Sequence, residues 1–275
     1  MIQGDVFTLR FDEVREGWEQ WFLLQSDVHW DNPHCDRRLF HKHLRQAKER
    51  NARIMVFGDF FCAMQGKGDK RGNKDDIRPE HKQGNYLDSL VDTAADDLAD
   101  YATLFEFLAL GNHEMSIEAH HETNLIDRLC KRLGVKAGGY AGFVRFLFNR
   151  GGSDKISHSL FWHHGAGGGG EVTKNVIDTN RKAVWLPDAT FVVRGHVHSE
   201  WLVTMPRVRL SQSGKVYLDE QLHLQLPTYK QEMHLNKGFH IEKGRPPKPL
   251  GGAWLRFYYD GDARGKVGYE VTRAK

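Results

Sequence analysis

The sequence predicts an α/β fold with an antiparallel addition near its C-terminal end. Short apolar runs, typical of buried strands, alternate with amphipathic helical segments over the first two thirds of the chain. From residue 201 onward, short alternating segments are separated by turn signals such as Ser213-Gly214. A chain of 275 residues is long enough for one large domain. We expect an α/β core over residues 1–205 and a β-rich part over 206–275 that packs on the same domain.

The expected elements of the first part follow each other in order. Apolar runs predict buried strands at 21–25, 54–57, 104–110, 140–148, 156–162 and 191–193. Apolar residues at helical spacing predict helices over 36–50 and 86–101, and a third helix with its apolar stripe over 125–133. Ser116 is a candidate N-cap of this third helix, and Gly134 fits its C-terminal stop. The basic, Gly-rich residues 65–74 are interpreted as a surface loop, either a solvated face or a lid.

The β-rich part contains five expected strands, at 208–212, 216–218, 222–226, 254–259 and 267–271. No stretch of the whole chain is long and apolar enough to cross a bilayer. The first fifteen residues alternate charged and apolar side chains, which is unlike a signal peptide. The three cysteines are scattered, without the spacing of a disulfide framework or a metal knuckle, so we expect a reducing, cytoplasmic environment.

The net charge of the chain excludes few classes of function by itself. Its net charge of +3 makes it mildly basic, which suits a phosphate-bearing substrate but does not indicate nucleic acid. Sixteen histidines are many for this length, and six of them lie in short motifs that also contain carboxylates, an amide and glycines.

Five such motifs carry the chemistry, and each follows an apolar, strand-like run. In chain order they are Asp27-Val28-His29, Gly58-Asp59, Gly111-Asn112-His113-Glu114, His163-His164-Gly165 and Gly195-His196-Val197-His198. Ligands of open α/β sheets bind at the carboxyl ends of the strands, so these motifs are expected to gather at one edge. Residues two apart in extended chain point the same way, which lets both side chains of each Asp-x-His or His-x-His pair converge on one ion.

Imidazole, carboxylate and amide oxygen ligands suit borderline or hard ions such as Mn, Fe, Zn or Ni. Two such ions about 3.5–4 Å apart would clamp a phosphoryl group. The carboxylate of Asp59 has two oxygens and can bridge two cations, whereas Asn112 adds a neutral oxygen ligand. His113 directly follows a candidate ligand, and we expect it to protonate the leaving oxygen or stabilise the transition-state charge. Glu114 is a candidate for orienting His113.

The five motifs in this order resemble the calcineurin-like metallophosphoesterase superfamily. The resemblance runs from Asp27 to His198, and the context of the motifs is similar to that of small phage- or prophage-type members. It implies a four-layer α/β/β/α sandwich of the metallophosphoesterase type with a dinuclear site at the strand ends, here followed by a β-rich C-terminal extension.

The resemblance also implies residue roles. One metal would be held by Asp27, His29 and His198, and Asp59 would bridge both metals. The second metal would be held by Asn112, His196 and either His163 or His164, a choice that the doubled histidine leaves open. Asp59 and His113 would be the catalytic residues, and Asn112 and His113 would contact the substrate. Many members have a second Asp where this chain has Cys62, and metal binding is expected to survive that difference.

The predicted function is therefore a dinuclear metal-dependent phosphoesterase, a phosphatase or phosphodiesterase. It would hydrolyse a phosphate mono- or diester by attack of metal-bound hydroxide, with Mn as the favoured metal. The alternative is a nuclease or a nucleic-acid-binding module of the same fold, although a binding module has no need of His113. A nucleotide or nucleic acid is thus a possible partner and a membrane is not, while the oligomeric state stays open.

Overall fold

The computed structural model describes residues 4–63, 77–151, 155–168, 170, 172–233, 241, 244–261 and 266–275. The predicted loop at 65–74 lies outside these residues. The strands are β1 (Asp5–Phe11), β2 (Trp18–Gln25), β3 (Arg53–Val56), β4 (Phe105–Ala109), β5 (Lys136–Gly138), β6 (Ala141–Asn149), β7 (Lys155–His163), β8 (Phe191–Arg194), β9 (Trp201–Leu210), β10 (Val216–Gln225), β11 (Gly252–Tyr259) and β12 (Gly268–Ala274). The helices are α1 (Arg37–Glu49), α2 (Tyr86–Leu98), α3 (Asn112–His121), α4 (Leu125–Leu133) and α5 (Asp178–Trp185), with short 3-10 helices η2 (Pro79–His81) and η3 (Ala99–Leu104).

The described strands form two six-stranded sheets. The first sheet has the order β12-β11-β2-β3-β4-β5, with β2 to β5 parallel and β11 antiparallel to both of its neighbours. The second sheet has the order β1-β6-β7-β8-β10-β9, and within it β7, β8 and β10 are parallel. Helices follow the parallel strands of the first sheet, so the predicted α/β class is confirmed. Residues 216–274 contribute strands to both sheets.

An apolar core lies between the two sheets. It is built from alternate strand positions such as Phe22 on β2, Phe107 on β4 and Trp162 on β7, all fully buried. The ring centroids of Phe107 and Trp162 are 4.9 Å apart, so aromatic contacts bridge the sheets directly. Each such side chain contributes roughly 1.5–3 kcal/mol through burial. This core fixes the two sheets relative to each other and therefore sets which strand ends meet.

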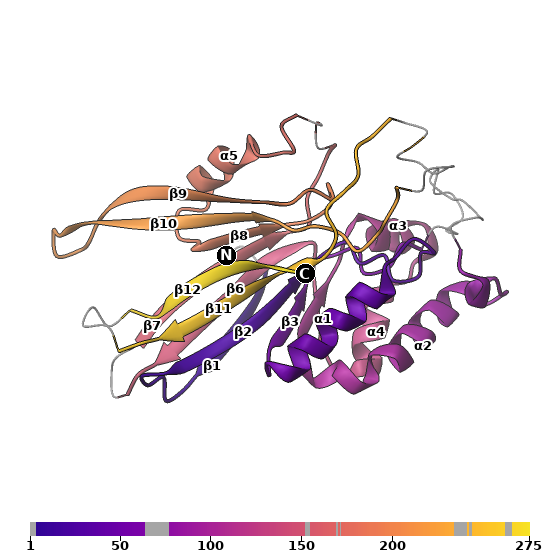
Figure 1. Ribbon diagram of the computed structural model, residues 1–275, viewed down its shortest axis with the longest axis horizontal. Coiled ribbons are helices and arrows are strands. Elements are labelled where there is room, and N and C mark those ends of the chain that lie inside the picture. Colours follow the sequence, from indigo (N-terminus) through magenta and orange to yellow (C-terminus); the bar gives the residue numbers. More distant parts are fainter. Residues whose placement is uncertain are drawn as a thin grey trace.

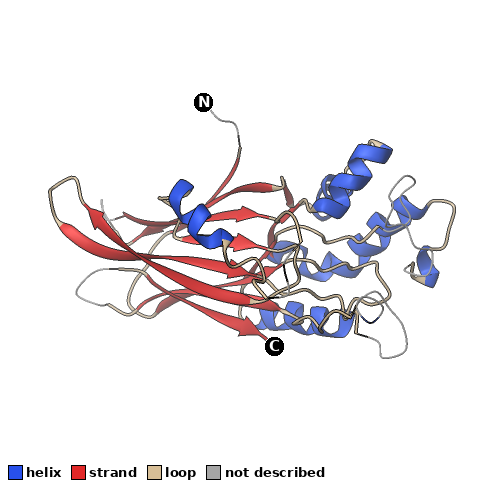
Figure 2. Cartoon of the chain, turned by 90° about the horizontal axis from the view of Figure 1, so that it is seen from above, coloured by secondary structure: helices blue, strands red, loops and turns tan. Residues whose placement is uncertain are grey.

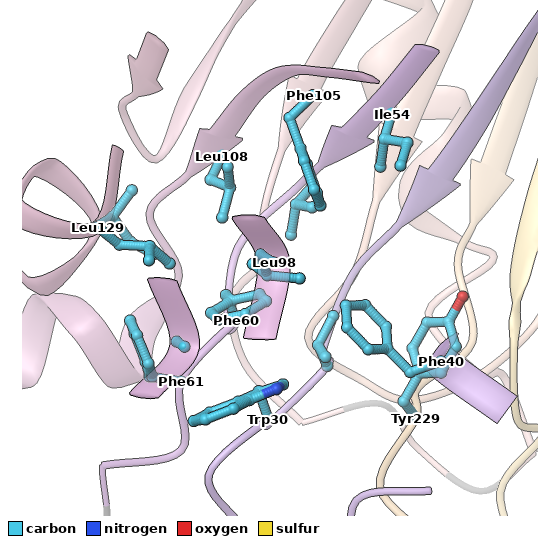
Figure 3. Close-up of a cluster of buried hydrophobic side chains, with 14 of the residues drawn as sticks. Trp30, Phe40, Ile54, Phe60, Phe61, Leu98, Phe105, Leu108, Leu129 and Tyr229 are labelled. Carbon is cyan, nitrogen blue, oxygen red and sulfur yellow. The ribbon is translucent and has the colours of Figure 1, made fainter. Parts of the chain in front are cut away.

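Helices α1, α2 and α4 cover the other face of the first sheet with a second apolar core (Figure 1). Figure 3 shows Trp30, Phe60 and Phe61 within it. These aromatic residues directly follow His29 and Asp59 of the predicted motifs. The rings of Phe60 and Phe61 meet edge to face with centroids 4.9 Å apart, and Trp30 Nε1 donates to Asp97 at 2.8 Å. The loops that carry the motifs are thus anchored in the core.

The expectation that Ser116 caps the third helix is wrong. Ser116 lies inside α3, a separate helix that begins at the Gly111-Asn112 motif and ends at Glu122 in a left-handed conformation. The following helix, α4, is capped by Asn124, whose side chain accepts from the backbone N–H of Asp127 at 2.8 Å. Gly134 ends α4 in the left-handed conformation, as predicted.

Helix α5 lies apart from the other four helices, over the outer face of the second sheet (Figure 2). A small apolar cluster beneath it includes Phe161, Leu186 and Val192. Among the described helices, none combines the length and the apolar character that crossing a membrane requires.

Candidate metal centre

All five motifs lie just beyond the carboxyl end of a strand or overlap its last residue. Strands β2, β3 and β4 of the first sheet end at Gln25, Val56 and Ala109, and strands β7 and β8 of the second sheet end at His163 and Arg194. Side chains from both sheets contact one another here, as His164 does with Asp59 and His198 with Asp27. The candidate site therefore lies at the edge where the strand ends of the two sheets meet, as the sequence predicts.

The backbone of the candidate ligands is unusual. Five of them have left-handed backbone conformations, with φ of 52° at Asp27, 49° at His29, 50° at Asp59, 73° at His196 and 51° at His198. Each left-handed non-glycine residue costs on the order of 1–3 kcal/mol and persists where its surroundings enforce it. Strained backbone is common at functional sites. Here the strained residues are the same ones that the sequence predicts as metal ligands.

Two glycines of the motifs are required by close packing. A Cβ atom on Gly111 would collide with the carboxylate of Asp59, and a Cβ atom on Gly195 would collide with the side chains of Ser26 and Asp27. Both carboxylates therefore lie against bare backbone. These contacts explain why glycine precedes the metal-ligand candidates in both motifs.

The first group of candidate ligands consists of Asp27, His29 and His198. Their ligand atoms all lie within 4.8 Å of one another. His198 Nε2 is 3.2 Å from Asp27 Oδ1 and 3.2 Å from His29 Nε2. Asp27 is further fixed by Ser26 Oγ and by the backbone N–H of His196, which both donate to its carboxylate.

The second group consists of Asp59, His164 and His196, again within 4.8 Å of one another. Asn112 joins it, because Asn112 Oδ1 is 3.2 Å from His164 Nε2 and 2.7 Å from His196 Nδ1. His164 Nε2 is also 3.2 Å from Asp59 Oδ2. One carboxylate, one amide oxygen and two imidazoles thus converge.

The hydrogen bonds of the imidazoles support metal binding. His164 Nδ1 lies 2.9 Å from the carbonyl of Phe57, and His196 Nε2 lies 2.9 Å from the carbonyl of Gly167. A carbonyl only accepts, so each of these nitrogens carries the proton, and the other nitrogen of a neutral ring presents a lone pair to the group. Backbone carbonyls orient metal-ligating histidines in this way in other proteins. The donor set therefore fits divalent ions such as Mn, Fe, Zn or Ni.

Of the doubled histidines, His164 joins the second group and His163 does not. His164 is fully buried. The side chain of His163 turns to the outer face of the second sheet, where its Nδ1 accepts from the backbone N–H of Gly165 at 3.0 Å. Burial, together with Lys182, lowers the pKa of His163 to about 4.

The electrostatics of the site favour an added positive charge. Burial alone would raise the pKa of Asp59, but His164 and His113 outweigh it and hold that pKa well below its usual range. Burial likewise opposes protonation of His164, yet Asp59 and Asp27 raise the pKa of His164 to about 10. Two buried carboxylates thus draw in a cation. A divalent metal would offset the negative charge of these carboxylates, as the proton on His164 does.

His113 lies at the rim of the site with a fixed orientation. Its Nδ1 donates to the backbone carbonyl of Cys62 at 2.6 Å, which leaves Nε2 directed toward Asp59 Oδ2 at 3.9 Å. Glu114 was expected to orient His113, but its buried carboxyl group binds backbone. It accepts from the N–H groups of Gly111 at 2.9 Å and Phe61 at 2.8 Å. The carbonyl of Cys62 thus helps to orient the ring of His113.

Sequence reasoning missed the contribution of Thr228 and Tyr229. Thr228 Oγ1 donates to the carbonyl of Asp27 at 2.8 Å, and the N–H of Tyr229 donates to the same oxygen at 3.0 Å. Thr228, Tyr229 and Asp27 are all fully buried. Thr228 and Tyr229 hold the left-handed Asp27 from a segment about 200 positions away. No local sequence motif indicates that Thr228 and Tyr229 have this role.

Comparisons with known proteins give only distant likenesses. No protein-family model and no curated protein sequence matches the chain. Among solved structures, a conserved uncharacterized protein of Streptococcus pneumoniae, described as a predicted phosphoesterase, aligns at 10% identity and a TM-score of 0.34, over 93% of this chain and 98% of that one. Vps29 of Chaetomium thermophilum aligns at 10% identity and a TM-score of 0.37, over 92% and 95% of the two chains.

A third structure is GAP50, described as the anchor in the inner membrane complex of Plasmodium. It aligns at 10% identity and a TM-score of 0.43, over 94% of this chain and 85% of that one. At TM-scores below 0.5 these likenesses establish neither a shared fold nor a shared activity. The geometry of the two ligand groups is the stronger indication of function.

Proposed function

We propose that the protein is a dinuclear metal-dependent phosphoesterase with the four-layer architecture of calcineurin-like metallophosphoesterases. The observation that carries this proposal is the convergence of two groups of metal-ligand side chains, one around Asp27 and one around Asp59, at one edge of two packed sheets. Helices α1 to α4 would form one outer layer and α5 the other.

In this proposal Asp27, His29 and His198 would hold one ion, and Asn112, His164 and His196 would hold the other. Asp59 would be shared by the two sites, because its carboxylate contacts His164 and its backbone carbonyl accepts from the N–H of His29 at 3.0 Å. When bound, two divalent ions supply Lewis acidity to a phosphoryl group and lower the pKa of a water nucleophile. Manganese is the favoured metal, and the free, buried cysteines favour a cytoplasmic location.

The protein side chains then orient the ester and move one proton. Asn112 lies within the second group and positions the phosphoryl oxygen near it. His113 carries its Nδ1 proton toward the Cys62 carbonyl, so its Nε2 faces the reacting group. A protonated Nε2 can donate to the leaving oxygen, as general acids do.

Hydrolysis of generic esters tests the proposal. Purified protein would be assayed with p-nitrophenyl phosphate and bis(p-nitrophenyl) phosphate in Mn²⁺ and after chelation. Hydrolysis of either ester that requires metal and is lost in Asp59→Asn supports the proposal. Activity that survives both treatments contradicts it.

A nuclease is the second candidate, and the basic face of α1 favours it. A groove of about 720 Å³ lies against α1 and is lined by Arg38, Lys42 and Arg45, together with Asp36 and Asp97. These three cations recur at helical spacing on one face, where the phosphates of a polynucleotide could bind. Cleavage of single- or double-stranded DNA, with a steep salt dependence that weakens in Arg38→Gln and Lys42→Gln, would favour this candidate.

A further inference from the structure

Asp31 is a buried carboxylate, only 2% exposed, that the proposed chemistry has not used. Its two oxygens accept from consecutive backbone N–H groups, that of Cys62 at 2.5 Å and that of Ala63 at 2.9 Å. The hydroxyl of Tyr86 lies 3.4 Å from the second oxygen. Asp31 thus spends its hydrogen bonds on the end of the loop that starts at Asp59.

This loop is held in a strained conformation. Ala63 is buried and has a left-handed backbone with φ of 48°, which costs on the order of 1–3 kcal/mol for a residue with a side chain. Glu114 binds the N–H of Phe61, and Asp31 binds the next two N–H groups. Two buried carboxylates therefore fix the orientation of the peptide group that joins Cys62 to Ala63.

That peptide group connects Asp31 to His113. Its N–H, on Ala63, donates to Asp31 Oδ2 at 2.9 Å, and its carbonyl, on Cys62, accepts from His113 Nδ1 at 2.6 Å. The peptide unit is rigid and planar, so the two hydrogen bonds share one orientation. Hydrogen bonds in such a chain polarise one another, and an ionised acceptor at one end strengthens them. The negative charge of Asp31 therefore makes the Cys62 carbonyl a stronger acceptor for His113.

We propose that Asp31 is a positioning residue for His113 and acts through the Cys62–Ala63 peptide group. This inference rests on the proposed function, in which His113 donates to the leaving oxygen. By holding the proton on Nδ1, the chain from Asp31 favours the ring orientation in which Nε2 points toward Asp59 Oδ2, 3.9 Å away. Asp31 thus supports the catalytic step from a buried position behind the loop.

The kinetic test uses Asp31→Asn, which keeps the size of the side chain and removes its charge. At saturating Mn²⁺, kcat for glycerol 2-phosphate, an alkyl ester, should fall about 10-fold, in line with the weakening of one hydrogen bond to a charged group. The loss should be smaller for p-nitrophenyl phosphate, whose leaving group needs no proton. A merely structural role would lower both rates equally, and that result overturns the inference.

A double-mutant cycle with His113→Gln shows whether Asp31 acts through His113. Adding Asp31→Asn to His113→Gln should lower kcat by less than about 2-fold, because the group that Asp31 orients is already absent. A full 10-fold further loss would overturn the inference. Metal content and circular dichroism are recorded for each variant, and Asp31→Ser, which keeps a neutral acceptor, replaces Asp31→Asn if the latter folds poorly.

The proton on His113 Nδ1 gives a readout that needs no activity. NMR spectra of protein labelled with ¹⁵N-histidine, with diamagnetic Zn²⁺ added, report its exchange with solvent, and His113→Gln identifies the signal. Exchange should be about 10-fold faster in Asp31→Asn, because the hydrogen bond that protects the proton is weaker. The matched control is Asp219→Asn, whose carboxylate binds Arg207 at 2.8 and 2.9 Å on another part of the chain, and it should exchange like the wild type.

The two readouts separate this inference from the proposed function. Wild-type exchange in a folded Asp31→Asn variant overturns the inference, whatever the activity of the protein. A wild type that hydrolyses no ester, but whose His113 proton is protected by Asp31, would refute the proposed function and leave the positioning of His113 by Asp31 standing.

Discussion

The Nε2 atoms of His29 and His198 lie 3.2 Å apart, although 169 positions separate the two residues. Two imidazole nitrogens at this distance can share one hydrogen between them. When neither nitrogen carries a hydrogen, both lone pairs can instead bind one cation. Asp27 supplies the negative charge beside them. Removing one of these imidazoles should therefore open the first ligand group.

His198→Ala is predicted to abolish hydrolysis of p-nitrophenyl phosphate and its diester, because the first ion loses one of its ligands. Activity is measured at saturating Mn²⁺, and metal content is measured on the same sample. Full activity in this variant would remove the claim that His198 holds a catalytic ion.

The adjacent histidines provide a matched pair. His164→Asn should lower metal affinity and activity by at least about 10-fold, because His164 contacts both Asp59 and Asn112. His163→Asn should keep both properties near wild type, because His163 bonds to the N–H of Gly165 on the other side of the strand. Equal effects of the two substitutions would contradict the assignment of His164 as the ligand.

His113→Gln separates catalysis from metal binding. The variant should keep its metals but lose about 100-fold to 10,000-fold in kcat, the usual contribution of a general acid. The loss should be smaller for an ester whose leaving group needs no proton, such as a p-nitrophenyl ester, than for an alkyl ester. A uniform loss across both leaving groups would argue against the acid role.

Thr228→Val tests the support of Asp27 from the distant segment. The substitution keeps the shape of the side chain and removes the 2.8 Å hydrogen bond to the Asp27 carbonyl. We expect Mn²⁺ affinity to fall by about 10-fold, as for other residues that orient metal ligands. The measurement is a competition titration with a metal-sensitive dye, and unchanged affinity would show that Asp27 needs no such support.

Stability should depend on pH through His43. Burial, together with Lys42, lowers the pKa of His43 to about 4, whereas an unfolded chain takes up the proton near 6.5. Its contribution to the free energy of unfolding is therefore complete above about pH 6.5. It is lost as the pH falls toward 4, by up to about 3 kcal/mol.

His43→Gln should flatten this part of the pH profile, measured by urea unfolding in the presence of a chelator. The Tyr229 hydroxyl can still form a hydrogen bond with the new side chain, as it now does with His43 Nδ1 at 2.8 Å. A profile as steep as that of the wild type would show that His43 is not the responsible group.

The sequence was sufficient to predict the strands that lead into the motifs, because their signals are local, but it did not predict α3, the helix that begins with Asn112 and His113. Strand β3, for instance, lies in an apolar run that leads into Gly58-Asp59. Strand β1 was missed although Asp5–Phe11 alternates in the manner of an edge strand. Helix α5 gave no helical signal because its pattern is inverted: Lys182 is buried and Val184 is exposed.

The choice between His163 and His164 could have been made from strand alternation. His164 has the same parity as Leu160 and Trp162, which face the core between the sheets, whereas His163 shares the parity of Phe161 on the outer face. The role of Thr228 could not have been predicted, since it depends on a tertiary contact with Asp27. The boundary at 205/206 stays a prediction.

The most direct test of two cations held side by side is the metal content of the protein. Wild-type protein would be incubated with Mn²⁺, dialysed and measured by mass spectrometry beside Asp59→Asn. We predict about two equivalents per wild-type chain and a loss of at least one in the variant, because Asp59 is the shared ligand. A folded wild-type protein that retains no divalent metal, or an Asp59→Asn variant that retains both, would contradict the account.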